Sequence, residues 1–337
     1  MQIKAGGTGS WPPIGRASMP GSGPGRRAAP AAGPGHETGP QDRRTDVAST
    51  RTGRRAMKSI LIATDLSARS DRALDRALAL AREQDARITV LHVVDDRLAQ
   101  AAIERREDEA KEAIAAYLAA RGPGQDATVS VTVGEADSDI LRAAGRCAAD
   151  LIVLGAHRVA PDDDTFQGST AWNVLRESRH PVLLVKEPAL APYRRVAVGF
   201  DFSGLSEAAL RLAFRFRPGE VDVMHVFHAP YQGFLTGADT QRDLREQCDR
   251  KLESAVGAVM RSLEPEQAEG VALRRLVCRG EIVGTLRQEC ETHRVDLLAI
   301  GTSGRSGLAH AIFGSIAESL LRDPPCDIVA VRGASGA

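Results

Sequence analysis

The stretch from Asp296 to Val331 reads DLLAIGTSGRSGLAHAIFGSIAESLLRDPPCDIVAV. After the first residue comes the apolar run LLAI, which is typical of a parallel strand that is buried on both faces. The glycine turn Gly301-Thr302-Ser303-Gly304 follows this strand, and Gly314-Ser315 comes after a spacer of nine residues, at the start of a predicted helix. A buried strand, a glycine turn and a helix in this order indicate one unit of an α/β fold.

The glycines and the helix start in this stretch have the chemistry of a phosphate site. Gly301 and Gly304 are expected to give the backbone a positive φ and to let it approach a ligand closely. Ser315 is expected to cap the following helix, and backbone amides at a helix start attract anions. The alternative is that these glycines only form turns. Because four landmarks agree in order and spacing, we predict a cradle for phosphate groups.

From Met57 onward the sequence repeats itself. The segment ILIATD at Ile60–Asp65 matches VAVGFD at Val196–Asp201, and each is followed by a serine and the pattern of an amphipathic helix. VLHV at Val90–Val93 corresponds to VMHV at Val223–Val226, and the later parts of the two copies stay 146 residues apart. Such sustained register indicates an internal duplication.

Each copy alternates strands and helices through five strands, which predicts an α/β fold of two tandem, doubly wound, parallel five-stranded sheets that is similar to a Rossmann fold. In open sheets of this kind, ligands bind beyond the carboxyl ends of the strands. Asp201, Val226 and Gly301 all lie at such ends, although an Asp in this position is also a common turn residue. The expected divisions are a disordered tail at 1–56, a first domain at 57–188, a linker at 189–193 and a second domain at 194–333.

Composition excludes several classes of protein. The chain has 337 residues, 43% of them hydrophobic and 26% charged, which favours a soluble protein of two globular domains. No stretch approaches ~18 consecutive apolar residues, so no membrane span is expected. Five cysteines without a C-x-x-C pair, together with the lack of a signal peptide, favour the reducing cytoplasm and argue against a metal site.

The first 56 residues differ from the rest of the chain. They contain 11 glycines and 7 prolines, and nine Lys or Arg against three Asp or Glu. This composition predicts a solvated, disordered tail, and contact of its basic residues with nucleic acid is the less favoured alternative. Met57 stands immediately before the first strand, so a translated tail and a chain that starts at Met57 are both consistent with the sequence.

The residues quoted above resemble the universal stress protein family. The spacing of its ATP-binding members, G-x-x-G, nine residues and G-[ST], occurs in the C-terminal half, and the resemblance covers about 57–188 and 194–333. It implies an adenine nucleotide alpha hydrolase-like fold in tandem form, with Asp201 near the adenine and ribose and Val226 offering backbone contacts to the base. The implied ligand is ATP, with or without Mg²⁺, bound by Asp201, Ser203, Val226, Gly301, Ser303, Gly304, Gly314 and Ser315.

The first half departs from this pattern. Gly155-Ala156-His157-Arg158 has an arginine in place of the second glycine, although Gly168-Ser169 keeps its place. A side chain at a position of positive φ costs about 1–2 kcal/mol, and the aspartates at 162–164 would repel a triphosphate. A guanidinium is, however, a good phosphate ligand. We therefore interpret this half as a degenerate second site formed by Asp65, Val93, Gly155, Arg158, Gly168 and Ser169.

Two further features bear on packing and assembly. His92 and His225 lie in the middle of predicted strands, where a histidine is more often a hydrogen-bonded core residue than a catalyst. Each half ends in an apolar strand, and members of the resembled family pair through that strand. We therefore expect Val182–Val185 to pair with Ile328–Val331 within the chain, as an intramolecular pseudo-dimer, with a further homodimer as an additional expectation.

The favoured function is that of an ATP-binding protein in stress response or signalling, with its intact site in the C-terminal half and no catalytic residue. The resemblance implies action through a conformational change linked to binding. One alternative is a slow ATP hydrolase, although the sequence has no P-loop lysine motif, no evident general base beside the cradle and no nucleophile elbow. The other alternative is an interaction module that binds no nucleotide.

Overall fold

The computed structural model describes residues 57–121, 127–156, 168–227, 238–303 and 314–333, and the predicted tail at 1–56 lies outside these ranges. The N-terminal half contains β1 (Ser59–Ala63), α1 (Ala68–Gln84), β2 (Arg87–Asp95), α2 (Gln100–Ala119), β3 (Ala127–Gly134), α3 (Ala136–Arg146), β4 (Leu151–Gly155), α4 (Thr170–Glu177) and β5 (Val182–Val185). The C-terminal half contains β6 (Arg195–Gly199), α5 (Gly204–Arg215), β7 (Glu220–Phe227), α6 (Ala238–Ser262), α7 (Pro265–Ala268), β8 (Ala272–Arg279), α8 (Ile282–Thr292), β9 (Leu297–Gly301), α9 (Ser315–Arg322) and β10 (Asp327–Val331).

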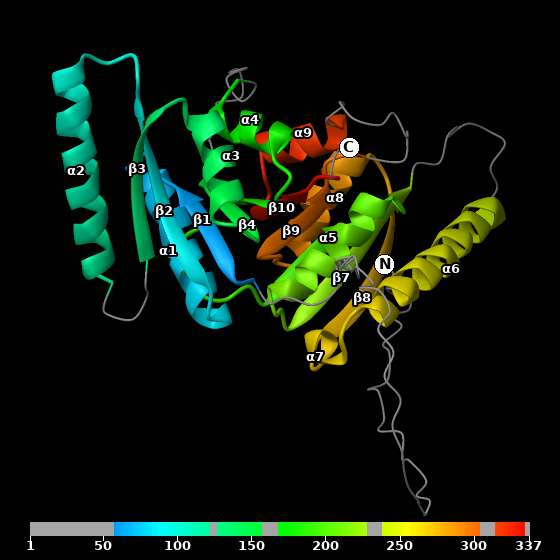
Figure 1. Cartoon of the computed structure of the whole chain (residues 1–337). Coiled ribbons are helices and arrows are strands. Elements are labelled where there is room, and N and C mark those ends of the chain that lie inside the picture. The colour runs from blue at the N-terminus through cyan, green and yellow to red at the C-terminus, as the bar shows by residue number, and fades with distance from the viewer. Residues whose placement is uncertain (1–56, 122–126, 157–167, 228–237, 304–313, 334–337) are drawn as a thin grey trace, which may run out of the picture.

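The strands form a single ten-stranded sheet in the order β3-β2-β1-β4-β5-β10-β9-β6-β7-β8 (Figure 1). All pairs within each half are parallel, whereas β5 and β10 are antiparallel, with Leu184 opposite Ile328 and Val182 opposite Ala330. The predicted pairing of the last strands is confirmed. The α/β class is also confirmed, but the two predicted sheets are halves of one sheet, because this pairing satisfies the backbone groups along both inner edges.

Helices cover both faces of the sheet (Figure 1). Residues of α1, α2, α5 and α6 belong to one hydrophobic core, and residues of α3, α4, α8 and α9 belong to the other. Side chains alternate between the two cores along each strand, as Ile60, Leu61 and Ile62 of β1 do. Each core contains residues from both halves, so the halves are joined by packing as well as by backbone hydrogen bonds.

The segment between the halves is anchored by a buried carboxylate. Tyr193 is buried, and its hydroxyl donates to Oδ2 of Asp327 at 2.5 Å. The guanidinium of Arg76 lies 4.1 Å from the centre of the Tyr193 ring. The backbone amides of Lys186 and Glu187 donate to Oδ1 of Asp327 at 2.8 and 2.9 Å. The linker is therefore held between α1 of one half and β10 of the other.

The short helix α7 is absent from the sequence prediction. It has a proline at its start, and Glu264 and Gln267 form a capping box around its first turn. A capping box normally precedes an apolar periodic segment, and none follows here, so the sequence has little signal for this helix.

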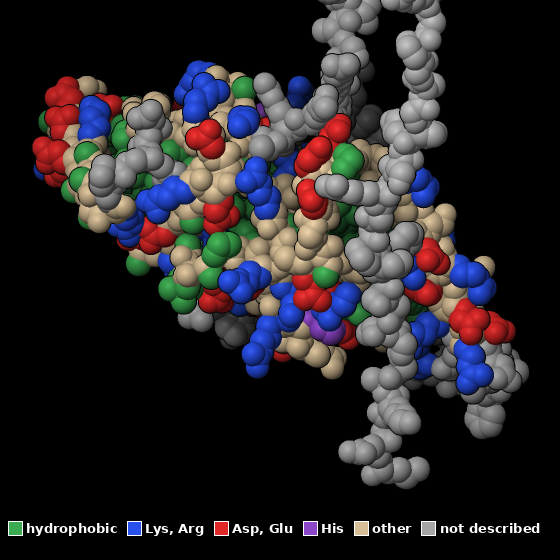
Figure 2. All heavy atoms as spheres, turned by 90° about the horizontal axis from the view of Figure 1, so that it is seen from below, with side chains coloured by type: hydrophobic (Ala, Val, Ile, Leu, Met, Phe, Trp, Pro, Cys, Tyr) green, Lys and Arg blue, Asp and Glu red, His purple; other side chains and the backbone are tan. Residues whose placement is uncertain are grey.

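The described surface carries mixed charge on the face drawn in Figure 2, where Lys and Arg side chains lie among Asp and Glu side chains. This face lacks the basic stripe that is typical of nucleic-acid binding among its described side chains. Within the described ranges, no helix has both the length and the apolar character that a membrane span requires.

Candidate functional site

A cavity of about 270 Å³ opens at the carboxyl ends of β6, β7 and β9. Its wall continues onto the first turns of α8 and α9, which lie on the same face of the sheet. Strand ends supply backbone groups and polar side chains, whereas Met224, Leu286 and Ile300 supply apolar surface. A cavity of this composition suits a ligand with one flat apolar part and one polar part.

The structure brings together six of the eight residues that the sequence predicts for this site. Ser203 does not line the cavity, because its Oγ accepts a hydrogen bond from the amide of Ser206 at 3.2 Å and caps α5. Gly304 lies outside the described residues. The six that line the cavity are Asp201, Val226, Gly301, Ser303, Gly314 and Ser315.

Asp201 has a structural role as well as its place in the cavity wall. Its Oδ1 accepts a hydrogen bond from the amide of Ser203 at 2.9 Å, which forms a tight turn between β6 and α5. Phe202, inside this turn, has a φ of 65°, a conformation that costs energy for a residue with a side chain. Both interpretations of the strand-end Asp, turn residue and cavity residue, therefore apply to the same side chain.

Gly301 differs from its prediction in the reason for being glycine. Its φ is not positive, which corrects the expectation from the sequence. A Cβ atom at this position would lie 2.7 Å from Cβ of Leu205 and 3.1 Å from the carbonyl carbon of the same residue. Glycine is needed here because α5 packs closely against the end of β9.

The start of α9 also differs from its prediction. The N-cap is Gly314, whose amide donates to the carbonyl oxygen of Thr302 at 2.8 Å, and Ser315 is the first helical residue rather than the cap. This contact brings Thr302 and Ser303 beside the start of α9. Amides of the first turn of α9 therefore adjoin the cavity, where they can donate to an anion.

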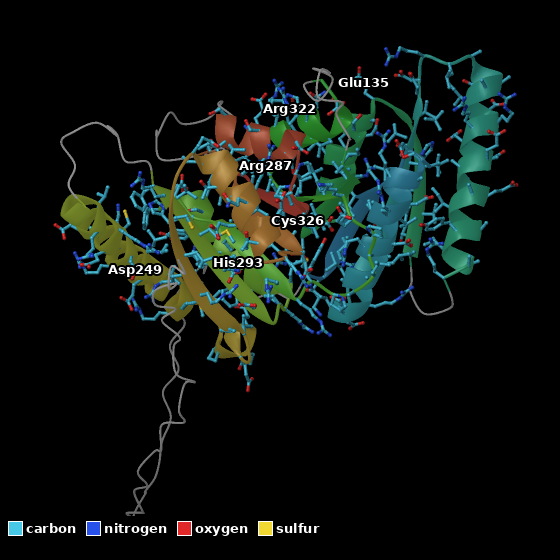
Figure 3. The ribbon with its side chains drawn as sticks, turned by 180° about the vertical axis from the view of Figure 1, so that it is seen from behind. Glu135, Asp249, Arg287, His293, Arg322 and Cys326 are labelled. Atoms are coloured by element: carbon cyan, nitrogen blue, oxygen red, sulfur yellow. The ribbon has the colours of Figure 1, made fainter. Side chains whose placement is uncertain are left out.

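Helices α8 and α9 hold each other beside the cavity. The guanidinium of Arg287 on α8 donates to the carbonyl oxygens of Ser319 and Asp323, each at 2.9 Å. Figure 3 shows Arg287 between the two helices, with Arg322 of α9 above it. Leu286, the neighbour of Arg287, lines the cavity. This bridge therefore fixes two walls of the site relative to each other.

One histidine in each half lines a cavity, and the sequence interpretation placed neither of them in the site. Nδ1 of His225 lies 2.8 Å from the carbonyl oxygen of Phe200, and Nδ1 of His92 lies 2.8 Å from that of Thr64. A carbonyl only accepts hydrogen bonds, so Nδ1 carries the proton in both rings. The predicted hydrogen bonds are confirmed, but both histidines are only partly buried and line cavities instead of lying in the core. The signal for their place in the site was their position next to Val93 and Val226 in both copies.

The N-terminal half contains an equivalent cavity, also of about 270 Å³. Four of its six predicted residues, Asp65, Val93, Gly155 and Ser169, line this cavity. Arg158 lies outside the described residues, as do the aspartates at 162–164. The sixth residue, Gly168, has a φ of 89° and does not line the cavity, while Ser169 caps α4 by accepting from the amide of Trp172 at 3.2 Å.

The carboxylate of Asp65 is held in its charged form. Burial raises its pKa, but hydrogen bonds from Ser67 and Ser70 and the nearby charge of Arg69 lower it, and the net pKa lies below the ordinary value. Its Oδ1 accepts from the amide of Ser67 at 3.0 Å, as Asp201 does from Ser203. Leu66 has a φ of 60°, like Phe202 in the other half, so the turn is the same in both copies.

Comparison with known proteins gives two matches to one family. A sequence model described as "Universal stress protein family" matches residues 57–186 and 192–332. A protein of Thermus aquaticus named "Universal stress protein in QAH/OAS sulfhydrylase 3'region" is 36% identical over 137 residues, an alignment that covers 38% of this chain and 98% of that protein. The two matches to the sequence model, one in each half, agree with the internal duplication.

Solved structures show the same fold. A universal stress protein from Archaeoglobus fulgidus DSM 4304 has a TM-score of 0.60 and is 22% identical, covering 81% of this chain and 98% of its own. A functionally unknown protein from Pseudomonas aeruginosa PAO1 has a TM-score of 0.52 and is 17% identical, covering 82% and 93%. Both align with most of the two-copy arrangement described above.

Proposed function

Because the chain belongs to the universal stress protein family, we propose that it binds ATP in the cavity of its C-terminal half. It acts in stress response or signalling, through a conformational change linked to this binding. We also propose that the protein works in the cytoplasm and that two whole chains form a homodimer.

One observation carries the proposal. Four residues of the glycine motif, Gly301, Ser303, Gly314 and Ser315, meet in the wall of one cavity although a spacer of nine residues separates the first two from the last two. The first turn of α9 supplies amide donors that suit phosphate oxygens. The apolar wall at the other side suits a nucleobase, and the carboxylate of Asp201 can accept from ribose hydroxyls.

Magnesium is compatible with these residues. Mg²⁺ prefers oxygen ligands and is usually held by one or two carboxylates together with substrate phosphates and water. Asp201, Ser303 and Ser315 offer such oxygens in the wall of the cavity. When bound, the ion would neutralise part of the triphosphate charge.

Filling the cavity tests the proposal. Ser315 is exposed and lines the cavity, so Ser315→Trp places a large side chain in it without disturbing the core. We expect ATP affinity at the C-terminal site to fall by more than about 100-fold, which corresponds to about 2.7 kcal/mol. Titration calorimetry with ATP measures this, and Ser319→Trp, at an exposed position on the same helix outside the cavity wall, is the matched control.

Equal ATP binding by the Ser315→Trp and Ser319→Trp variants would contradict the proposal. Phosphate release, measured on the same samples, separates binding from hydrolysis. Retained ATP without phosphate release supports a binding protein, steady release supports the slow hydrolase, and neither retention nor release supports an interaction module.

A further inference from the structure

The two cavities differ in one charged residue. Arg69, the second residue of α1, lines the N-terminal cavity, and the equivalent second residue of α5 is Leu205. Leu205 does not line the C-terminal cavity but packs against Gly301. Among the described residues in the wall of the C-terminal cavity, none is Lys or Arg. Among the described residues, a cation therefore lines one cavity and not the other.

The guanidinium of Arg69 is available to a ligand. It is partly exposed and, in the described part of the chain, makes no hydrogen bond or ion pair. Its charge nevertheless reaches Asp65, since it contributes to the lowered pKa of that carboxyl. Arg69 and Asp65 thus place one positive and one negative group in the same cavity.

The features that the two cavities share are those that suit a nucleoside. The turn that presents Asp65 is the same as the turn that presents Asp201, with an Asp carboxylate that accepts from a serine amide two residues later. His92 holds its Nδ1 proton toward a backbone carbonyl, so Nε2 is the ring nitrogen that can act as an acceptor. Such an acceptor suits the amino group of a base, and Val93 beside it offers backbone groups.

The features that differ are those that would hold phosphates. A guanidinium presents a planar pair of donors that matches one phosphate group, and Thr170, at the start of α4, adds a hydroxyl. The residues that follow Gly155 lack the second glycine of the C-terminal turn. Among the described residues, the N-terminal cavity thus offers one cationic ligand, which suits a single phosphate group.

We propose that the N-terminal cavity is a second ligand site, for a nucleotide that carries a single phosphate group, with Arg69 as the ligand of that phosphate. Asp65, His92 and Val93 hold the nucleoside. This inference rests on the proposed function, because the nucleoside end is assigned by its likeness to the C-terminal cavity.

The test uses the full chain with the C-terminal cavity filled by Ser315→Trp, so that only the N-terminal cavity responds. Titration calorimetry with AMP should give one site per chain, with weaker binding for adenosine and for ATP. Adding Arg69→Leu, which copies the residue of the other half, should weaken AMP binding by about tenfold or more and change adenosine binding by less than about twofold.

The matched control is Arg82→Leu, which removes the same charge from the last turn of α1, away from the cavity. Melting temperatures of all variants show that each one folds. Equal AMP affinity in the Arg69→Leu and Arg82→Leu variants would overturn the inference, as would ATP binding more tightly than AMP. Competition by inorganic phosphate as strong as that by AMP would also overturn it, because the nucleoside would then contribute nothing.

The outcomes separate this inference from the proposed function. If Ser315→Trp leaves ATP binding unchanged, the proposed C-terminal site is wrong, while AMP binding that depends on Arg69 would still support the N-terminal site. If Ser315→Trp abolishes ATP binding and AMP does not bind, the proposed C-terminal site is supported and the N-terminal site is wrong.

Discussion

Gly301 lines the cavity, but the structural reason for its glycine differs from the predicted one. Its position in the site follows from the spacing of the glycine motif, but its backbone does not need a positive φ. Close packing of a helix on a strand end requires glycine at the same place. Gly155 has the same environment in the other half, where an added Cβ would lie 3.0 Å from the carbonyl oxygen of Arg69.

This explanation predicts the effect of adding one methyl group. Gly301→Ala forces α5 away from β9, and overpacking of this kind costs about 1–3 kcal/mol of unfolding free energy. The control is Gly204→Ala, at the first position of α5, where nothing lies within 4 Å of the added Cβ. Urea denaturation should show a loss for Gly301→Ala and no loss for Gly204→Ala. Equal stability of the two variants would contradict the packing argument.

The limits of sequence reasoning at this scale have physical causes. Asp201, Val226 and the glycine motif could be predicted, because strand ends and turns have local signals. Arg69 could not, since an arginine in the first turn of a helix is ordinary in a sequence, and only the fold shows that it lines a cavity. His92 and His225 gave a signal through repetition, but a histidine in a strand does not reveal which side it faces.

Among the elements, β8 is the edge strand of the C-terminal half and depends on a buried ion pair. Nε and Nη2 of Arg274 on β8 donate to the two carboxylate oxygens of Asp222 on β7, each at 2.7 Å. Asp222 is fully buried, whereas the Arg274 side chain is 31% exposed and lies 2.7 Å from Glu220 as well. The equivalent pair of strands in the N-terminal half, β2 and β3, has Thr89 opposite Thr128.

Removal of this carboxylate should loosen the edge strand. Asp222→Ala leaves Arg274 with Glu220 and, at 3.5 Å, Nδ1 of His293 as partners, so we expect a loss of about 3 kcal/mol, at the low end for breaking a buried pair. Arg105→Ala, which removes an exposed pair with Glu109 on α2, should change stability by less than about 0.5 kcal/mol. Chemical denaturation gives both values, and faster hydrogen exchange confined to β8 would locate the effect. A loss for Asp222→Ala as small as that for Arg105→Ala would refute the role of this ion pair in stabilising β8.

The order of elements could be predicted far better than their assembly. Buried parallel strands have apolar runs that are visible locally, so the strands and long helices of both copies match their predictions. Helix α7 has four residues and no apolar period, which leaves too little signal. The joining of two sheets into one depends on contacts between residues about 146 apart, and it was predicted from the apolar character of β5 and β10 together with the family resemblance.

The whole molecule is held together at the centre by Asp327. This carboxylate joins β10, the linker and, at 3.5 Å, the guanidinium of Arg76 on α1. Burial raises its pKa above the ordinary value of 3.8, although hydrogen bonds from Glu187, Tyr193 and Lys186 and the charge of Arg76 oppose this rise. The junction of the two halves therefore contains a carboxyl group whose ionisation is opposed by burial.

A raised pKa has a definite effect on stability. A carboxyl whose pKa is higher in the folded state stabilises the fold fully below the unfolded pKa, and this contribution is lost as the pH rises through the folded pKa. The free energy of unfolding of the wild type minus that of Asp327→Asn should therefore be largest below pH 3.8 and should fall as the pH rises toward neutral. Urea denaturation across this range measures the difference. The control is Asp243→Asn, which removes an exposed carboxyl of α6. A difference for Asp327→Asn that rises with pH would contradict this assignment.

The antiparallel contact between β5 and β10 also has an evolutionary meaning. Two identical subunits that met through such strands would have to carry identical cavities, since any substitution would appear in both. Here the contact lies inside one chain, so an exchange such as arginine at 69 against leucine at 205 alters one cavity and spares the other. Covalent fusion thus gives the descendants of a duplicated gene freedom to diverge in ligand while they keep the contact that holds them together.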